Sequence, residues 1–337
     1  MKKLFDALNA ALEQGQNAVL CTILASSGST PRGAGARMAV FADGRTLGTV
    51  GGGAVEQEAL RQAEEVLRSG CETLQAYCLA PNQVDDLGMV CGGNVTVYFQ
   101  RFTPEDMPRR ELLREVSCAL NGRENAWLIM ELRDGLVVQT GLYQPSAGLR
   151  FGQWDEDTLM PLLRSRAVLQ KGESTLYAEP IRRAGRVYVF GAGHVSRALV
   201  PVLKSVDFAV TVYDPRPELA CREHFPEADE IMLGDFADVG MRLNITKDDY
   251  VVIMTPGHQA DREVLVQALR TPATYVGCIG SRRKIETTKA YLAQQGLPAE
   301  TWERVHAPIG LPIGGETPAE IPVSIAAEMI DHRSKQQ

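Results

Sequence analysis

The fold of the C-terminal half follows from residues 186–214, which read RVYVFGAGHVSRALVPVLKSVDFAVTVYD. An apolar strand leads into a glycine turn, an amphipathic helix follows the turn, and a second apolar strand ends at Asp214. This order of elements predicts a dinucleotide-binding βαβ unit.

The glycine turn contains the residue types that anion binding needs. Gly191 permits a sharp turn, and Gly193 lets the backbone approach a pyrophosphate closely. A helix that starts near His194 would direct its free N–H groups and its positive dipole end at that anion. Asp214 stands where a ribose hydroxyl is bound, whereas the nearby cation of Arg216 favours a phosphate.

The third position of the glycine fingerprint holds Ser196 instead of glycine or alanine. The residues alone therefore leave two interpretations open. In the first, the crevice binds a phosphate or a nucleotide. In the second, the chain uses a Rossmann scaffold whose crevice is empty or makes protein contacts.

Composition sets the broad class of the protein. A chain of 337 residues with 45% hydrophobic residues can fill two cores, so we expect two domains or more. A net charge of −7 gives no general attraction to nucleic acid or to anionic membranes. Asp6, Asn9 and Glu13 interrupt the apolar region that a signal peptide would need at the N-terminus, and no apolar run is long enough to span a membrane. These features predict a soluble, cytoplasmic protein.

Seven cysteines without framework spacing fit a reducing compartment. The chain has no CxxC pair and no clustered Cys/His set, which argues against structural zinc. Cys21 and Cys278 lie in apolar strands and Cys118 in a helix, so we expect all three in the core. Cys91 lies on a glycine-rich loop, where it either packs or presents a thiolate to a ligand.

Hydrophobic periodicity predicts an α+β module at the N-terminus. We expect helices over 4–12, 54–68 and 110–120, and strands over 18–24, 38–41, 46–50, 73–78, 95–99, 127–132 and 136–140. A domain over 1–180 then comprises a motif core, 1–100, and a β-rich extension, 101–180. The boundary to the second domain, 181–337, is expected near residues 181–185.

Strands and helices alternate beyond that boundary. We expect strands over 187–190, 209–213, 231–233, 251–254 and 275–279. Such alternation predicts a parallel, doubly wound sheet, so the fold class is α/β, with a C-terminal Rossmann-like domain and an N-terminal α+β domain. A capping box at residues 317–320 predicts a final helix that runs to about Met329.

Residues that follow parallel strands carry particular weight, because ligands bind outside the carboxyl ends of such strands. His194, Asp214 with Arg216, and His258 follow successive strands. His258 lies near Asp261, as a base with its orienting carboxylate or as a helix-capping histidine. The last strand is followed by Ser281, Arg282 and Arg283, which suit a phosphate, an acidic partner surface or plain solvation.

The N-terminal half has its own glycine-rich loops. Residues 26–37, SSGSTPRGAGAR, combine hydroxyls, glycines and two arginines that suit an anionic group. Gly51, Gly52 and Gly53 then precede a helix, which gives a second anion-accepting terminus. Glu56 in the first turn of that helix either competes with an anion for the dipole or serves as an acid.

Five ordered motifs resemble those of the XdhC/CoxI family of molybdenum-hydroxylase accessory proteins. They are GSTPRGAGARMAVFADGRTLGTVGGGAVEQEAL (28–60), CGGNVTVYF (91–99), VFGAGHVSRAL, YVGCIGSRRK and VHAPIGLPIGGETPAEIPVSIAAEMI. The resemblance implies a cofactor-binding chaperone, not an enzyme, for the molybdenum cofactor in its molybdopterin or dinucleotide form. It also implies two partners, a cysteine desulfurase-type sulfurase and the apo-enzyme of a xanthine dehydrogenase-type hydroxylase, and it leaves a homodimer open.

The family resemblance carries over to particular positions. Its first loop matches Gly28, Ser29, Pro31, Arg32 and Gly35, its second loop matches Gly52, Gly53 and Glu56, and its CGG turn matches Cys91 and Gly92. Many similar proteins have a cysteine where this chain has Ala54, so Cys91 becomes the candidate metal ligand.

Two other functions fit the residues. One is an NAD(P)-dependent oxidoreductase with His194 or His258 as acid or base, although the chain lacks a recognisable Tyr-x-x-x-Lys pair. The other is a sensor whose C-terminal domain binds a nucleotide and whose N-terminal domain changes partner affinity.

Overall fold

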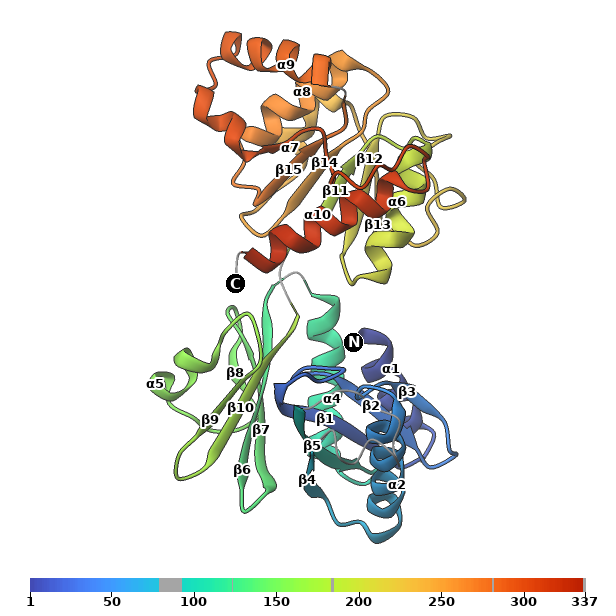
Figure 1. Ribbon diagram of the computed structural model, residues 1–337, viewed down its shortest axis with the longest axis vertical. Coiled ribbons are helices and arrows are strands. Elements are labelled where there is room, and N and C mark those ends of the chain that lie inside the picture. Colours follow the sequence, from blue (N-terminus) through green and yellow to red (C-terminus); the bar gives the residue numbers. More distant parts are fainter. Residues whose placement is uncertain (79–92, 123, 183–184, 281, 336–337) are drawn as a thin grey trace. The chain divides into compact units, whose positions relative to one another are not determined.

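The computed structural model describes residues 1–78, 93–122, 124–182, 185–280 and 282–335. Contacts within the chain divide it into two compact units, Met1–Arg183 and Ala184–Gln337. Each unit has its own sheets and its own hydrophobic cores (Figure 1).

The first unit begins with an antiparallel sheet of strand order β3-β2-β1-β5-β4. Its strands are β1 (Ala18–Gly28), β2 (Arg37–Phe41), β3 (Thr46–Gly48), β4 (Thr73–Cys78) and β5 (Gly93–Phe102). The two faces of β1 alternate, since Ala18 and Leu20 enter one core and Val19 and Cys21 the other. Helices α1 (Lys2–Glu13) and α4 (Met107–Asn121) cover the first face, and α2 (Gly53–Ser69) covers the second.

A second antiparallel sheet completes this unit, in the order β8-β7-β6-β10-β9. Its strands are β6 (Ala126–Arg133), β7 (Leu136–Gln144), β8 (Gly148–Arg150), β9 (Val168–Lys171) and β10 (Thr175–Arg182). The sequence predicts only β6 and β7 of this sheet. The short strands β8 and β9 are too brief for a periodic signal, and β10 contains Glu179 and Pro180, which are uncommon in strands.

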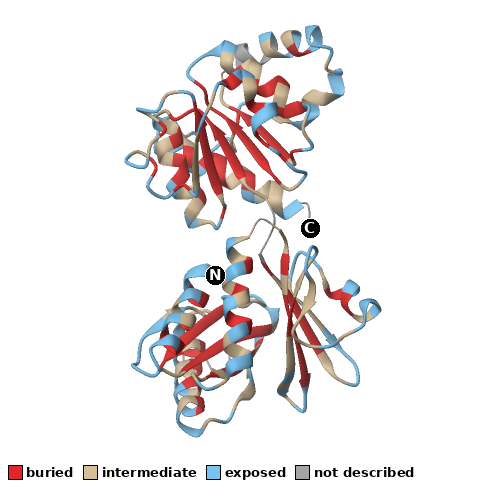
Figure 2. Cartoon of the chain, turned by 180° about the vertical axis from the view of Figure 1, so that it is seen from behind, coloured by how far each residue is buried: buried red, intermediate tan, exposed pale blue. Residues whose placement is uncertain are grey.

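The second unit confirms the expected α/β fold class. Its sheet is entirely parallel, in the order β13-β12-β11-β14-β15-β16. The strands are β11 (Val187–Phe190), β12 (Val210–Asp214), β13 (Glu230–Leu233), β14 (Tyr250–Ile253), β15 (Tyr275–Cys278) and β16 (Val305–His306). Figure 2 shows the central strands β11, β12, β14 and β15 as buried, whereas β13 and β16 at the two edges are less covered. This order, 3-2-1-4-5-6, is that of a doubly wound dinucleotide-binding fold.

Helices cover both faces of the parallel sheet. One face packs against α6 (His194–Ser205) and α10 (Ile321–Lys335). The other packs against α7 (Val239–Arg242), α8 (His258–Leu269) and α9 (Arg282–Gln294). Buried faces on both sides explain why the central strands read as continuous apolar runs.

Two sequence expectations need correction. The last helix begins at Ile321 and continues to Lys335, although the capping box does form, with Thr317 Oγ1 accepting from Glu320 N at 3.2 Å. Residues 318–320 form a turn before the helix begins. Cys118 is exposed because it lies on the outer face of α4.

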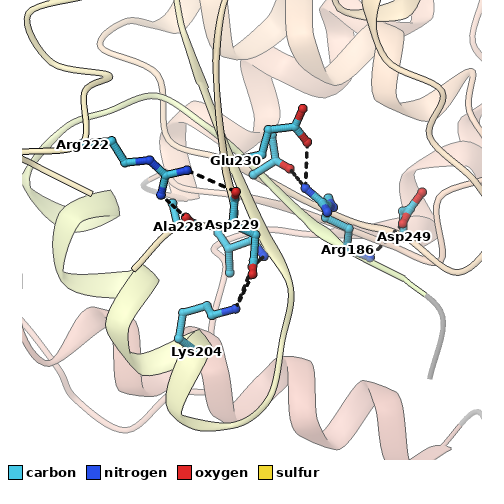
Figure 3. A network of polar contacts seen from close by, with 9 residues as sticks. Arg186, Lys204, Arg222, Ala228, Asp229, Glu230 and Asp249 are labelled. Atoms are coloured by element: carbon cyan, nitrogen blue, oxygen red, sulfur yellow. Dashed lines mark hydrogen bonds and ion pairs between the residues drawn. The ribbon is translucent and has the colours of Figure 1, made fainter. Parts of the chain in front are cut away.

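A charged network lies at the amino ends of the parallel strands (Figure 3). The guanidinium of Arg186 donates to Thr211 Oγ1 at 2.6 Å and to Glu230 Oε2 at 2.8 Å. Lys204 pairs with Asp229 at 2.7 Å. Burial favours a higher pKa for Asp229, but the hydrogen bonds from Lys204 and the Val210 N–H outweigh it and lower the pKa. These groups hold the amino ends of β11, β12 and β13 together.

Side-chain contacts between α10 and β15 predict that the stability of the second unit depends on pH. Glu328 accepts from Tyr275 Oη at 2.5 Å, and the His332 ring lies edge-on to Tyr275 and His306. Burial, and then the neighbouring His306, lowers the pKa of His332. The unfolded chain takes up a proton near pH 6.5, whereas the folded imidazole resists it, so stability should fall as the pH drops through this range.

We expect His332→Gln to flatten the pH dependence of unfolding between pH 7 and 5.5, as measured by urea titration. His258→Gln, at an exposed histidine in the same unit, is the matched control. An unchanged slope in His332→Gln would contradict the assignment.

Candidate functional site

The glycine turn after β11 lies where the strand order of the parallel sheet reverses. Gly191 has a φ of 107°, and its N–H donates to Tyr213 O at 2.9 Å. A Cβ atom at this position would lie 2.2 Å from Met254 O, at the end of β14. Only glycine therefore fits where three strands meet at the switch point, which is the usual ligand crevice of such sheets.

Two helices begin at this crevice without a side-chain cap. The N-caps are Gly193 for α6 and Gly257 for α8, and a Cβ atom at either would meet no atom within 4 Å. His194 and His258, the first residues of the two helices, are exposed. The open N–H groups of both first turns suit an anion. Ser196 is completely buried, so its small side chain preserves close helix–strand packing.

Asp214 at the end of β12 is completely buried. Its Oδ2 accepts from Ala192 N at 2.7 Å, and its carboxylate also accepts from Arg216 Nε at 2.8 Å and Arg216 Nη2 at 2.7 Å. Burial favours a higher pKa, but the hydrogen bonds from Arg216 and Ala192 outweigh it and lower the pKa of Asp214. The carboxylate thus anchors the glycine turn, and Arg216 faces solvent in its place.

A small pocket lies at the carboxyl ends of β14 and β15. His258, Asp261 and Cys278 are among its lining residues. Asp261 is buried and accepts from Thr255 N at 3.0 Å and from Thr255 Oγ1 at 2.5 Å, so this carboxylate fixes the turn after β14. Arg282 and Arg283 begin α9, which follows β15, and Ser281 lies outside the described residues.

Three segments of the first unit meet at the end of β1. Gly28 pairs with Gly93, the first residue of β5. A Cβ atom on Gly93 would lie 2.6 Å from Ser29 O, and one on Gly51 would lie 3.1 Å from Pro31 Cβ. The structure therefore brings the loop 28–36, the glycines before α2 and the start of β5 together.

The loop 28–36 presents exposed groups at this junction. Ser29, Pro31 and Arg32 are exposed. The N–H groups of residues 29, 30 and 32–34 make no hydrogen bond with another residue in the described part of the chain. Backbone N–H groups and a guanidinium together form a suitable surface for a phosphate.

Glu56, in the first turn of α2, holds the glycine turn that precedes this helix. Its Oε2 accepts from Gly52 N at 3.1 Å and from the hydroxyl of Thr49, which in turn accepts from Gly51 N at 3.0 Å. Gly52 and Gly53 have φ values of 72° and 57°, which suit glycine. No side chain caps the first N–H groups of α2, so the carboxylate fixes the preceding turn, and its negative charge lowers the attraction of this helix end for an anion.

A buried ion pair between Arg37 and Glu179 lies next to Gly35 of the loop 28–36. The guanidinium of Arg37 donates to Glu179 Oε2 at 3.0 Å, and both side chains are 3% exposed. A Cβ atom on Gly35 would lie 2.8 Å from the same carboxylate oxygen, which explains the glycine. Arg37 and Glu179 lie 142 positions apart in the sequence, so no local signal could pair them.

Cys91, the predicted metal ligand, and the neighbouring Gly92 lie outside the described residues. Within the described ranges, no group of three or more His, Cys, Asp or Glu side chains is placed to hold a metal ion. Burial raises the pKa of the Cys21 thiol far above its usual range, so this cysteine is a core residue. Sequence reasoning missed Thr49, whose hydroxyl links Gly51 to Glu56, and Gly93, whose close approach to Ser29 depends on the pairing of β5 with β1.

Family models match both units. Residues 187–329 match the XdhC Rossmann domain, and residues 11–77 match the XdhC and CoxI family. The chain belongs to the XdhC and CoxI family. Among the described residues, no helix is long and apolar enough to cross a membrane.

Relatives cover nearly the whole chain. It is 28% identical to a Bacillus subtilis protein that is named as a component of a probable xanthine dehydrogenase, over 97% of each chain. It is 22% identical to the Escherichia coli protein named "Molybdenum cofactor insertion chaperone PaoD", over 97% of this chain and 87% of that protein. A crystal structure described as a xanthine dehydrogenase from Bacillus halodurans superposes with a TM-score of 0.83, at 26% identity, over 99% of this chain and 96% of that one.

Proposed function

We propose that this XdhC/CoxI protein binds the molybdenum cofactor in its first unit and supports insertion of that cofactor into a xanthine dehydrogenase-type hydroxylase. The observation that carries the proposal is the meeting of the loop 28–36 with the glycines 51–53 and the start of β5. The name of the Escherichia coli relative supports the insertion role, and the name of the Bacillus subtilis relative supports a link to xanthine dehydrogenase.

The residues at this junction fit the chemistry of the cargo. A pterin cofactor with a phosphate or dinucleotide tail is anionic, and the exposed N–H groups of the loop and Arg32 would hold that phosphate. Cys91 stands two positions before Gly93 in the sequence, and a thiolate is a suitable soft ligand for the metal centre. In this proposal the negative charge of Glu56 disfavours the phosphate at the N-terminus of α2, so the phosphate is held by the loop.

An exposed site suits a carrier, because the cargo must be released to a second protein. In the proposed sequence, a cysteine desulfurase-type sulfurase meets the cofactor while this protein holds it. The hydroxylase apo-enzyme then receives the cofactor. The chain contributes binding and orientation of the anionic tail to these steps.

Arg32→Ala tests this proposal directly. Loss of a charge-assisted hydrogen bond to phosphate should weaken cofactor binding by about tenfold or more. The measurement is anaerobic activation of a purified apo-hydroxylase by cofactor-loaded protein, across a range of chaperone concentrations. The variant should need about tenfold more protein for half-maximal activation and should unfold at the same temperature as the wild type.

Arg45→Ala is the matched control, because Arg45 is an exposed arginine on the β2–β3 turn, away from the loop 28–36. It should activate the hydroxylase as the wild type does. Equal activation by Arg32→Ala would remove the loop from the site, and no activation by wild-type protein beyond free cofactor would overturn the chaperone role.

A further inference from the structure

The carboxylate that would bind a ribose hydroxyl in the second unit is already occupied. Asp214 Oδ1 accepts from the N–H and Nε of Arg216, and Oδ2 accepts from Ala192 N and Arg216 Nη2. The side chain has no exposed surface. A ribose diol could reach it only by displacing Arg216 from a buried charge, which is costly.

Arg216, and not Asp214, is accessible to a ligand at the end of β12. Its side chain is 34% exposed, while that of Asp214 is fully covered. Two of its donors, Nε and one at Nη2, hold Asp214. A guanidinium has five N–H groups, and the others make no hydrogen bond with a described residue. The Asp214 contacts thus hold the planar fork in place with free donors at its outer side.

The position of Arg216 in the fold defines what it can meet. Asp214 ends β12, which neighbours β11, and it bonds directly to the glycine turn. In this strand order the pyrophosphate lies at the glycine turn, and the adenosine ribose lies toward the end of the second strand. An arginine at that point accommodates a phosphate on the ribose.

We infer that the crevice of the second unit selects a nucleotide that carries a phosphate on its ribose, at the 2′ or the 3′ oxygen, over one with a free ribose. The uncapped start of α6 holds the 5′ phosphate, and Arg216 holds the ribose phosphate. This inference does not depend on the cofactor site of the first unit.

Nucleotide fragments test the selection without any variant. We would titrate the full chain with 5′-AMP, 2′,5′-ADP and 3′,5′-ADP by calorimetry at low ionic strength. At least one bisphosphate should bind about tenfold or more tightly than 5′-AMP, and the better of the two identifies a 2′ or a 3′ phosphate. Equal affinities, or no binding of any fragment, would overturn the inference.

Variants test whether Arg216 causes the preference for a bisphosphate. Arg216→Gln should abolish the preference for a bisphosphate over 5′-AMP, and Arg270→Gln, at the other end of the sheet, should keep it. Glu218, whose charge acts on Arg216, opposes an anion, so Glu218→Gln should strengthen bisphosphate binding. Glu218→Gln leaves the buried pair of Asp214 and Arg216 intact, so it tests the inference even if Arg216→Gln does not fold. A preference that survives in folded Arg216→Gln, or an unchanged affinity in Glu218→Gln, would contradict the assignment.

Discussion

Gly191→Ala is expected to destabilise the second unit by about 3 kcal/mol or more. The new Cβ would lie 2.2 Å from Met254 O, and the residue would keep a φ of 107° that L-amino acids rarely adopt. Strain at such a dihedral costs about 1–3 kcal/mol, and overpacking adds about 1–3 kcal/mol. Relief requires β11 and β14 to separate, which would also open the crevice.

Gly193→Ala is the matched control two positions further on. A Cβ atom there meets nothing within 4 Å, and the backbone has a φ of −78°, which any residue adopts. We expect this variant to fold normally and to weaken nucleotide binding, since the backbone at this position has to approach the pyrophosphate closely. Urea unfolding followed by circular dichroism and calorimetric binding separate the two effects. Equal stability of both variants would contradict the close-approach account of Gly191.

Arg37→Met is expected to destabilise the first unit by about 3–5 kcal/mol. Arg37 and Glu179 are both buried, so removal of the guanidinium leaves a carboxylate without its compensating charge. Burial raises the pKa of Glu179, and Arg37 opposes that shift. Without Arg37 the carboxyl group should become protonated in the folded state, so the loss of stability should shrink as the pH falls.

The double variant Arg37→Met, Glu179→Met is the control for this pair. Replacement of both charges by apolar side chains should recover most of the stability that the single variant loses. Urea unfolding of the wild type and both variants at pH 7.5 and pH 5 measures the effect. A single variant as stable as the wild type, or a deficit that does not change with pH, would argue against a buried charged pair.

Much of the second unit could be predicted from sequence. Apolar strands of the parallel sheet are buried on both sides and are separated by helices, so their order and the glycine turn are local features. The two-residue strand β16 has no periodic signal and was missed. The role of Asp214 could not be predicted, because it depends on the orientation of Arg216 and on a bond to Ala192.

The first unit was harder to predict for a physical reason. Its strands are antiparallel and several are short, and the second sheet contains polar residues such as Glu131 and Glu179 whose partners are distant in sequence or in another strand. The glycine-rich loops at 28–36 and 51–53 could be recognised from their residue composition. Their meeting with Gly93 follows from the register of β1 and β5, which the sequence does not specify locally.

The measurement that tests the central proposal most directly identifies the metal and the organic ligand that are bound to the protein when it is isolated from cells. The chain would be isolated anaerobically from cells that make molybdenum hydroxylases, and its bound metal and organic ligand identified by elemental analysis and mass spectrometry. The account predicts molybdenum together with a pterin. A protein without molybdenum and pterin, from cells whose hydroxylase is fully loaded, would contradict it.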